Sequence, residues 1–92
     1  MKAIWKGTVI ADSPHTVVMD GNHYFPAASL KRELTTFSNH RSRNAYGEEQ
    51  WLSLFVNGDL LPDAVWFYPA PTELGAALKD HVAFVQAVQI SD

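Results

Sequence analysis

The Asn57-Gly58 dipeptide, which lies between two apolar runs, constrains the fold of this chain more than any other feature. Asn-Gly readily adopts the positive φ angles of a two-residue hairpin turn, so it predicts that the flanking runs pair as antiparallel strands. The run QWLSLFV at 50–56 is largely apolar on both alternating sides, which is typical of a strand covered on both faces. Its predicted partner, AVWFY at 64–68, ends at Pro69. The sequence therefore predicts an antiparallel sheet with this hairpin at its centre.

Earlier parts of the chain carry further strand and turn signals. The β-branched runs GTVIAD at 7–12 and HTVVMD at 15–20 flank Pro14 and together predict a hairpin. Gly21 then suits a tight turn that leads into a short strand at 23–25, which Pro26 ends because it has no N–H to donate. Successive rings in this strand point to opposite faces, so we expect Phe25 in the core and Tyr24 near solvent.

Helical signals are short. The segment AASLKREL at 27–34 predicts a single helical turn, and an extended TTF follows it. The segment SNHRSRNAYGEE at 38–49 has no apolar period and is interpreted as the longest irregular loop. Pro71, Thr72 and Glu73 indicate a helix start. Residues 81–90 fit a helical and an alternating pattern equally well, and we expect a short helix over 72–80 and a strand over 82–90.

These elements predict a β-rich α+β fold: one compact domain over residues 1–92, an antiparallel sheet built from hairpins with one or two short helices. With 92 residues, of which 47% are hydrophobic and 18% charged, the chain has the composition of a folded globule with one core. It has no cysteine, which excludes a disulfide, a thiolate zinc site and a cysteine nucleophile. Because it shows neither a signal-peptide core nor a run of about 20 apolar residues, we expect a soluble cytoplasmic protein without membrane contact.

Charge is unevenly distributed along the chain. The net charge of −3 argues against a nucleic-acid partner. Between residues 31 and 43, however, four basic residues and one acid (4 − 1) give +3, which leaves −6 for the remainder. His40, Arg41 and Arg43 surround Ser42 and form a candidate anion-binding group, because arginine offers paired donors to a phosphate or carboxylate. The alternative is that these residues are ordinary solvated surface.

The remaining candidate residues are aromatic. His23 or Tyr24 could line a cleft and transfer protons, although the same stretch could simply be a structural corner. Trp66 and Tyr68 share one face of their strand and could form a pocket wall or pack in the core. The spacings typical of metal sites and of phosphate-binding glycine loops are absent, so we predict neither a metal nor a cofactor.

Three functions remain open at this point. The leading interpretation is a binding or interaction module. The second is an enzyme or binding protein for a phosphorylated or carboxylated small molecule, and the third is a homodimer formed through an exposed sheet edge.

The order of motifs resembles the family called domain of unknown function 427, a small bacterial and fungal family that also carries a nucleotidyltransferase-like label. The residues that carry the resemblance are Gly7, VIADS at 9–13, GNHYFP at 21–26 with Ser29, AVWFYPAP at 64–71 and VAF at 82–84. It spans nearly the whole chain and implies a compact β-rich domain without an established activity. Members typically have a Cys-Pro-Trp-Lys-Gly-like stretch, and the matching residues 43–47 (RNAYG) keep only its glycine. Any family function that needs that cysteine or lysine lacks its residue here.

Overall fold

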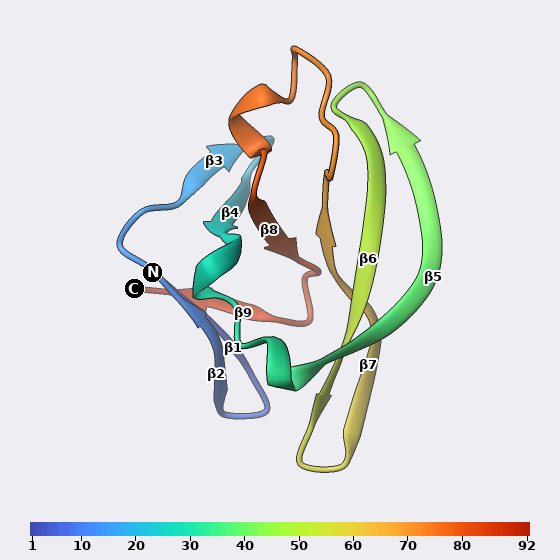
Figure 1. The fold of residues 1–92 in the computed structure, drawn as a ribbon. Coiled ribbons are helices and arrows are strands. Elements are labelled where there is room, and N and C mark those ends of the chain that lie inside the picture. Colours follow the sequence, from blue (N-terminus) through green and yellow to red (C-terminus); the bar gives the residue numbers. More distant parts are fainter.

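The chain folds into two antiparallel sheets packed on each other (Figure 1), and the computed structural model describes all residues from 1 to 92. The larger sheet has the strand order β3-β4-β8-β7-β6-β5, and the smaller sheet has the order β2-β1-β9. The strands are β1 (Lys2–Trp5), β2 (Thr8–Asp12), β3 (Val17–Met19), β4 (Asn22–Pro26), β5 (Thr35–Asn44), β6 (Gly47–Val56), β7 (Asp59–Phe67), β8 (His81–Phe84) and β9 (Gln89–Ser91).

The hairpin at Asn57-Gly58 is confirmed. Both turn residues have positive φ, 51° and 85°, and they join β6 to β7 with Val56 opposite Asp59. In Figure 1, β6 lies between β5 and β7, and the three strands form the longest part of the larger sheet. Four of the five residues of the predicted strand at 64–68 form the end of β7, which begins earlier, at Asp59. The fifth, Tyr68, follows the strand directly before Pro69.

The loop predicted at 38–49 is wrong, because most of it is strand. β5 continues to Asn44, and β6 begins at Gly47 after a tight turn. An edge strand that extends beyond the core needs no apolar alternation, since its backbone pairs with β6 while its side chains face water. The facing side chains are polar, and Arg43 lies 3.7 Å from Glu48 on the opposite strand.

The hairpin predicted from the two β-branched runs is also wrong. β2 pairs with β1, while β3 pairs with β4 in the other sheet. Each strand instead uses the nearest two-residue turn, and these turns, Lys6-Gly7 and Asp20-Gly21, have positive φ at both positions. Gly21 thus lies in a turn, as expected.

The α component of the predicted fold class is wrong, because the structure has no α-helix. It has three 3-10 turns, η1 (Ala27–Ser29), η2 (Arg32–Leu34) and η3 (Ala76–Leu78). The helix predicted at 72–80 reduces to η3, since so short a segment cannot offset the cost of starting a helix. The strand predicted at 82–90 is two strands, β8 and β9, which a turn between Val85 and Val88 directs into different sheets. None of the helices is long and apolar enough to cross a membrane.

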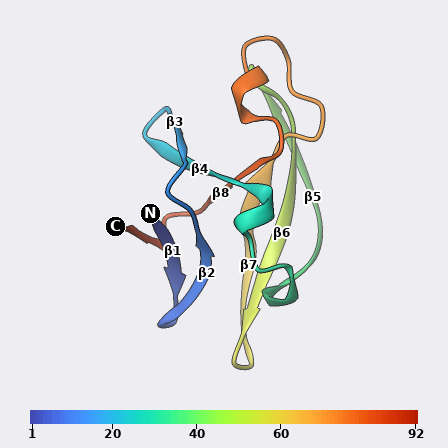
Figure 2. The same ribbon diagram turned by 60° about the vertical axis from the view of Figure 1, so that its left-hand side comes forward.

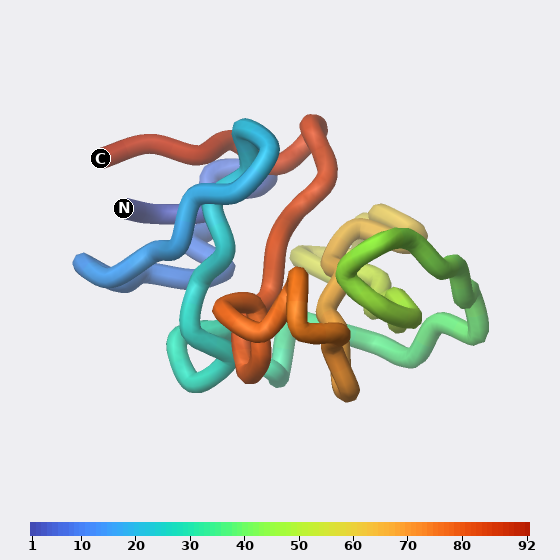
Figure 3. The backbone as a smooth tube through the Cα atoms, turned by 90° about the horizontal axis from the view of Figure 1, so that it is seen from above, coloured from blue at the N-terminus to red at the C-terminus, as the bar shows by residue number.

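The core lies between the two layers that Figures 2 and 3 show from different sides, with β1, β2 and β9 on one side and β5, β6 and β7 on the other. Phe25 is fully buried there, as predicted, and its ring packs edge-on against Phe84 at 5.5 Å between centroids. Tyr24 points to the opposite face but is only 2% exposed, so the expectation that it lies near solvent is wrong. It packs in a second buried cluster that includes Tyr68, Leu78 and Ala83.

Candidate ligand-binding site

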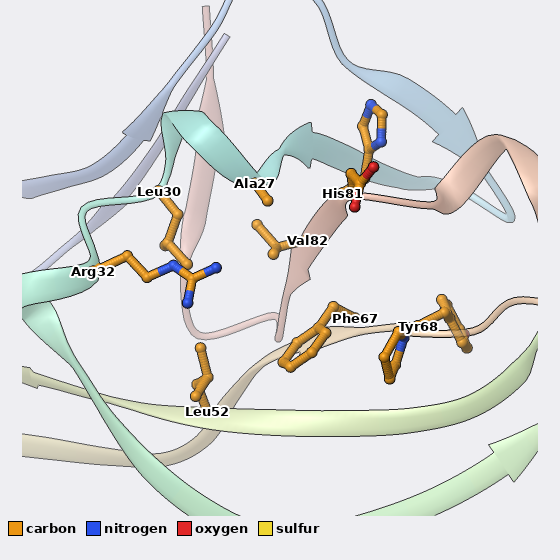
Figure 4. Close-up of a pocket in the computed structure, with 10 residues that line it drawn as sticks. Ala27, Leu30, Arg32, Leu52, Phe67, Tyr68, His81 and Val82 are labelled. Carbon is orange, nitrogen blue, oxygen red and sulfur yellow. The ribbon is translucent and has the colours of Figure 1, made fainter.

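A pocket of about 310 Å³ opens where the segment after β4 crosses the inner face of the larger sheet (Figure 4). Its floor is formed by β6 and β7, its roof by residues 27–32, and one end by the residues at the start of β8. The lining residues are Ala27, Leu30, Arg32, Leu52, Phe67, Tyr68, Pro69, Asp80, His81 and Val82. Six of these ten residues are hydrophobic, and a mixed lining of this kind is usual for small-molecule sites.

The roof is held in place by backbone hydrogen bonds to β2 of the smaller sheet and to the residue that precedes β8 of the larger sheet. The N–H of Ala27 donates to the carbonyl of Asp80 at 2.7 Å, and the N–H of Lys31 donates to the carbonyl of Ile10 at 2.9 Å. The side chains of Leu52 and Phe67 below are only half-buried, because the roof does not reach down onto them. The pocket is the space that these two fixed layers leave open.

Arg32 supplies a positive charge at this pocket. Figure 4 shows its guanidinium reaching from η2 into the space among Leu30, Val82 and Phe67. The ion pairs of the structure are Lys6–Asp59 and Arg43–Glu48, and the Arg32 side chain takes part in neither. A guanidinium has five N–H donors and no acceptor, so this one can offer paired donors to an anion.

Asp80 and His81 lie at the other end of the pocket. The His81 Nδ1 lies 2.7 Å from the carbonyl oxygen of Lys79, and in Figure 4 its ring points away from Arg32. Asp80 has a positive φ of 60°, and its carbonyl holds the roof through Ala27. The carboxylate of Asp80 makes no ion pair. The lining thus includes one cationic and one anionic residue, Arg32 and Asp80, and neither takes part in an ion pair.

Trp66 and Tyr24, two of the predicted candidates, meet on the opposite face of the larger sheet. Their rings pack edge-on at 6.1 Å, and the Trp66 Nε1 donates to the Tyr24 hydroxyl at 3.3 Å. β8 lies between their strands, and its small Ala83 allows the two rings to touch. This arrangement is that of a packed aromatic cluster.

The Tyr68 hydroxyl is engaged in a polar network next to that cluster. It donates to Glu49 at 3.2 Å and accepts a bond from the Asn44 amide at 3.0 Å. Ser42 donates to the other carboxylate oxygen of Glu49, and Trp51 donates to Ser42. Burial, with Tyr24 and Glu49 nearby, raises the pKa of Tyr68 above its ordinary range, against a smaller lowering effect of Asn44. The hydroxyl therefore remains a proton donor within this network.

The basic residues at 40–43 do not converge on one point. His40 lies beside Trp51, on the face of β5 that also carries Ser42. Arg41 and Arg43 alternate with Ser42 and leave the strand on the other side. Arg41 donates to the carbonyls of Ser38 and His40, and none of the three predicted residues lines a pocket.

His23 lines a second hollow, which lies between the start of β4 and the turn after β8. Trp66 also borders this hollow, whereas Tyr24 does not. The Nδ1 of His23 lies 3.0 Å from the Thr16 hydroxyl. No three His, Asp or Glu side chains of the chain gather into a set that could hold a metal ion.

Sequence reasoning counted Arg32 among the basic residues but did not select it. The available signal was its place in AASLKREL, a short crossing segment that begins after a strand-ending proline. The pocket walls gave no local signal, because Leu52, Phe67 and Val82 belong to three strands that meet only in the folded protein.

Comparison with known proteins supports the resemblance inferred from the motifs. A family model labelled NTP_transf_9, with the description "Domain of unknown function (DUF427)", matches residues 1–91. No curated protein matches the chain.

Proposed function

Because the chain belongs to the DUF427 family, whose description names no activity, we propose a function from its pocket: the protein binds a small organic anion beside Arg32. One observation carries this proposal, namely an arginine without a protein partner at the edge of an apolar pocket. The ligand has a carboxylate or phosphate group at the guanidinium and an apolar body between Leu52, Phe67 and Val82.

The expected affinity follows from the two contacts. Burying roughly 100 Å² of apolar ligand surface contributes about 2.5 kcal/mol. An ion pair with the exposed Arg32 adds about 0.2–1 kcal/mol. Because association also costs translational and rotational freedom, we expect weak binding, with a dissociation constant in the millimolar range. The site is thus suited to a metabolite that is abundant, and its exposed charge makes binding sensitive to salt.

Two features support binding over catalysis. Tyr68 lines the pocket, but its hydroxyl is already engaged with the carboxylate of Glu49. Within the pocket the His81 ring is turned toward the Lys79 carbonyl, away from the space beside Arg32.

A thermal-shift screen tests this proposal. Aliphatic and aromatic carboxylates, sugar phosphates and nucleotides are added at low and moderate salt to the parent, to Arg32→Ala and to Lys31→Ala. Lys31 is an exposed neighbour that does not line the pocket, so it serves as the matched control. At ten times its dissociation constant a ligand stabilises the fold by roughly 1.4 kcal/mol, which raises Tm by about 5–10 °C in a domain of this size.

We expect the parent and Lys31→Ala to respond alike and Arg32→Ala to lose the response. The Arg41→Ala/Arg43→Ala double variant tests the competing site on β5. An anion that stabilises the parent and Arg32→Ala equally, or that depends on Arg41 and Arg43 instead, contradicts the proposal.

A further inference from the structure

The two ends of the pocket carry opposite charges. Arg32 enters from η2, whereas Asp80 precedes β8, and both residues line the same space. Arg32 and Asp80 form no ion pair with each other, although both line the pocket.

The carboxylate of Asp80 takes part in neither of the ion pairs of the structure. By contrast, Asp59 pairs with Lys6, and the carboxylates of Asp63 and Asp20 accept hydrogen bonds from the hydroxyls of Ser38 and Tyr46. The backbone of Asp80 is held in position, because its carbonyl accepts from Ala27 and its φ is 60°, which aspartate tolerates better than most residues. An unpaired carboxylate on this anchored backbone, at the lining of a pocket, is available to a cation.

Both charges are solvated in the free protein and lose part of that solvation when a ligand fills the pocket. A ligand with one charged end covers the other protein charge with an apolar group, and that desolvation is uncompensated. A ligand with two anionic ends would bring its second anion to Asp80. Only a ligand with an anion at one end and a cation at the other compensates both the Arg32 guanidinium and the Asp80 carboxylate.

From this geometry we propose that the pocket selects zwitterions, with a carboxylate at Arg32, an ammonium group at Asp80 and an apolar body between them. Amino carboxylates with an apolar spacer and small apolar peptides have this chemistry. This inference rests on the proposed function and adds to it the class of ligand. Because both side chains are exposed, the second ion pair strengthens binding by about 2- to 5-fold.

Four probes with the same six-carbon chain separate the possibilities: 6-aminohexanoate, hexanoate, hexanedioate and hexylamine. Dissociation constants are measured by calorimetry at low salt for the parent, Asp80→Asn and Glu73→Gln. Asparagine keeps the shape of Asp80 and also tolerates a positive φ, so the fold should persist. Glu73 is exposed and lies outside the pocket, which makes it the control for loss of one negative charge.

We expect the parent and Glu73→Gln to bind 6-aminohexanoate about 2- to 5-fold more tightly than hexanoate, and both more tightly than hexanedioate. In Asp80→Asn this preference disappears, while hexanoate binds as well as before or better. Suppose that hexanoate binding depends on Arg32 but the parent does not prefer 6-aminohexanoate over hexanoate, or that Asp80→Asn keeps this preference. The zwitterion inference then fails, and the proposed function stands. If no carboxylate binds in an Arg32-dependent way, both are overturned.

Discussion

Phe25 packs its ring against Phe84 at the centre of the core and has no exposed surface. Truncation to alanine leaves a cavity that the fixed strands cannot close, so we expect Phe25→Ala to lower the free energy of unfolding by about 3–5 kcal/mol. Phe37 is 75% exposed and provides a matched control, for which we expect a change below about 0.5 kcal/mol. Urea unfolding measures both, and equal losses in the two variants would show that Phe25 is not the anchor described.

Tyr68 makes stability depend on pH in the alkaline range. Its pKa in the folded protein is raised, mainly by burial, above the ordinary value of 10.0. Above pH 10 the unfolded chain loses this proton while the folded protein keeps it, so the stabilisation, which is complete below pH 10, falls as pH rises.

We therefore expect Tyr68→Phe to lose less stability than the parent when urea unfolding is compared at pH 8 and pH 11. Tyr46→Phe is the control: a hydrogen bond to Asp20 raises the pKa of Tyr46, but the group is exposed to solvent screening. Removing the Tyr46 hydroxyl should change the pH dependence of the free energy of unfolding less than removing the Tyr68 hydroxyl does. Identical pH dependence in the parent and Tyr68→Phe would contradict the assignment.

At the scale of elements, the segment after β7 is fastened to the tip of the β5–β6 hairpin. The backbone N–H of Thr72 donates to the carbonyl of Tyr46 at 2.9 Å, and the Thr72 hydroxyl donates to the carbonyl of Ala45. Gly75 lies so close that an added Cβ would be 2.8 Å from the Tyr46 Cβ. A side chain at this position must push the two segments apart.

We expect Gly75→Ala to lower the free energy of unfolding, measured by urea unfolding, by about 1–3 kcal/mol, as overpacking usually does. Its φ lies outside the positive range, so the loss reports steric contact alone. Ala77→Ser, an exposed change in the same segment, should be neutral. A Gly75→Ala protein as stable as Ala77→Ser would mean that the segment does not press on Tyr46.

The sequence predicted strands and turns better than it predicted partners. Asn57-Gly58 and Gly21 were recognisable because turn geometry is local. The partner of β2 was not, since it depends on which of several possible turns the folded chain uses. The part of β5 after Phe37 was missed because a polar edge strand has no apolar period. The homodimer through a sheet edge stays a prediction, and at β5 it would have to displace Arg41 from the carbonyls of Ser38 and His40.

At the scale of the whole molecule, the pocket beside Arg32 exists because the chain connectivity brings distant segments together. The segment after β4 is hydrogen-bonded to Ile10 in the smaller sheet and to Asp80, the residue before β8, and the pocket lies beneath this segment. Motif and composition could indicate the β-rich class and the family. They could not place Arg32 opposite Asp80, because 47 intervening residues (33 to 79) must fold before the two charges share one space.

The most direct test of the anion site is a methyl NMR titration with hexanoate on protein labelled at its leucine and valine methyl groups. We expect the methyl signals of Leu30, Leu52 and Val82, which line the pocket, to shift together and to saturate with a single dissociation constant. The signals of Val18, which is 60% exposed and lies outside the pocket, should stay in place. In Arg32→Ala the three pocket residues should no longer respond. Pocket signals that do not move in the parent, or that move equally in Arg32→Ala, would contradict the site.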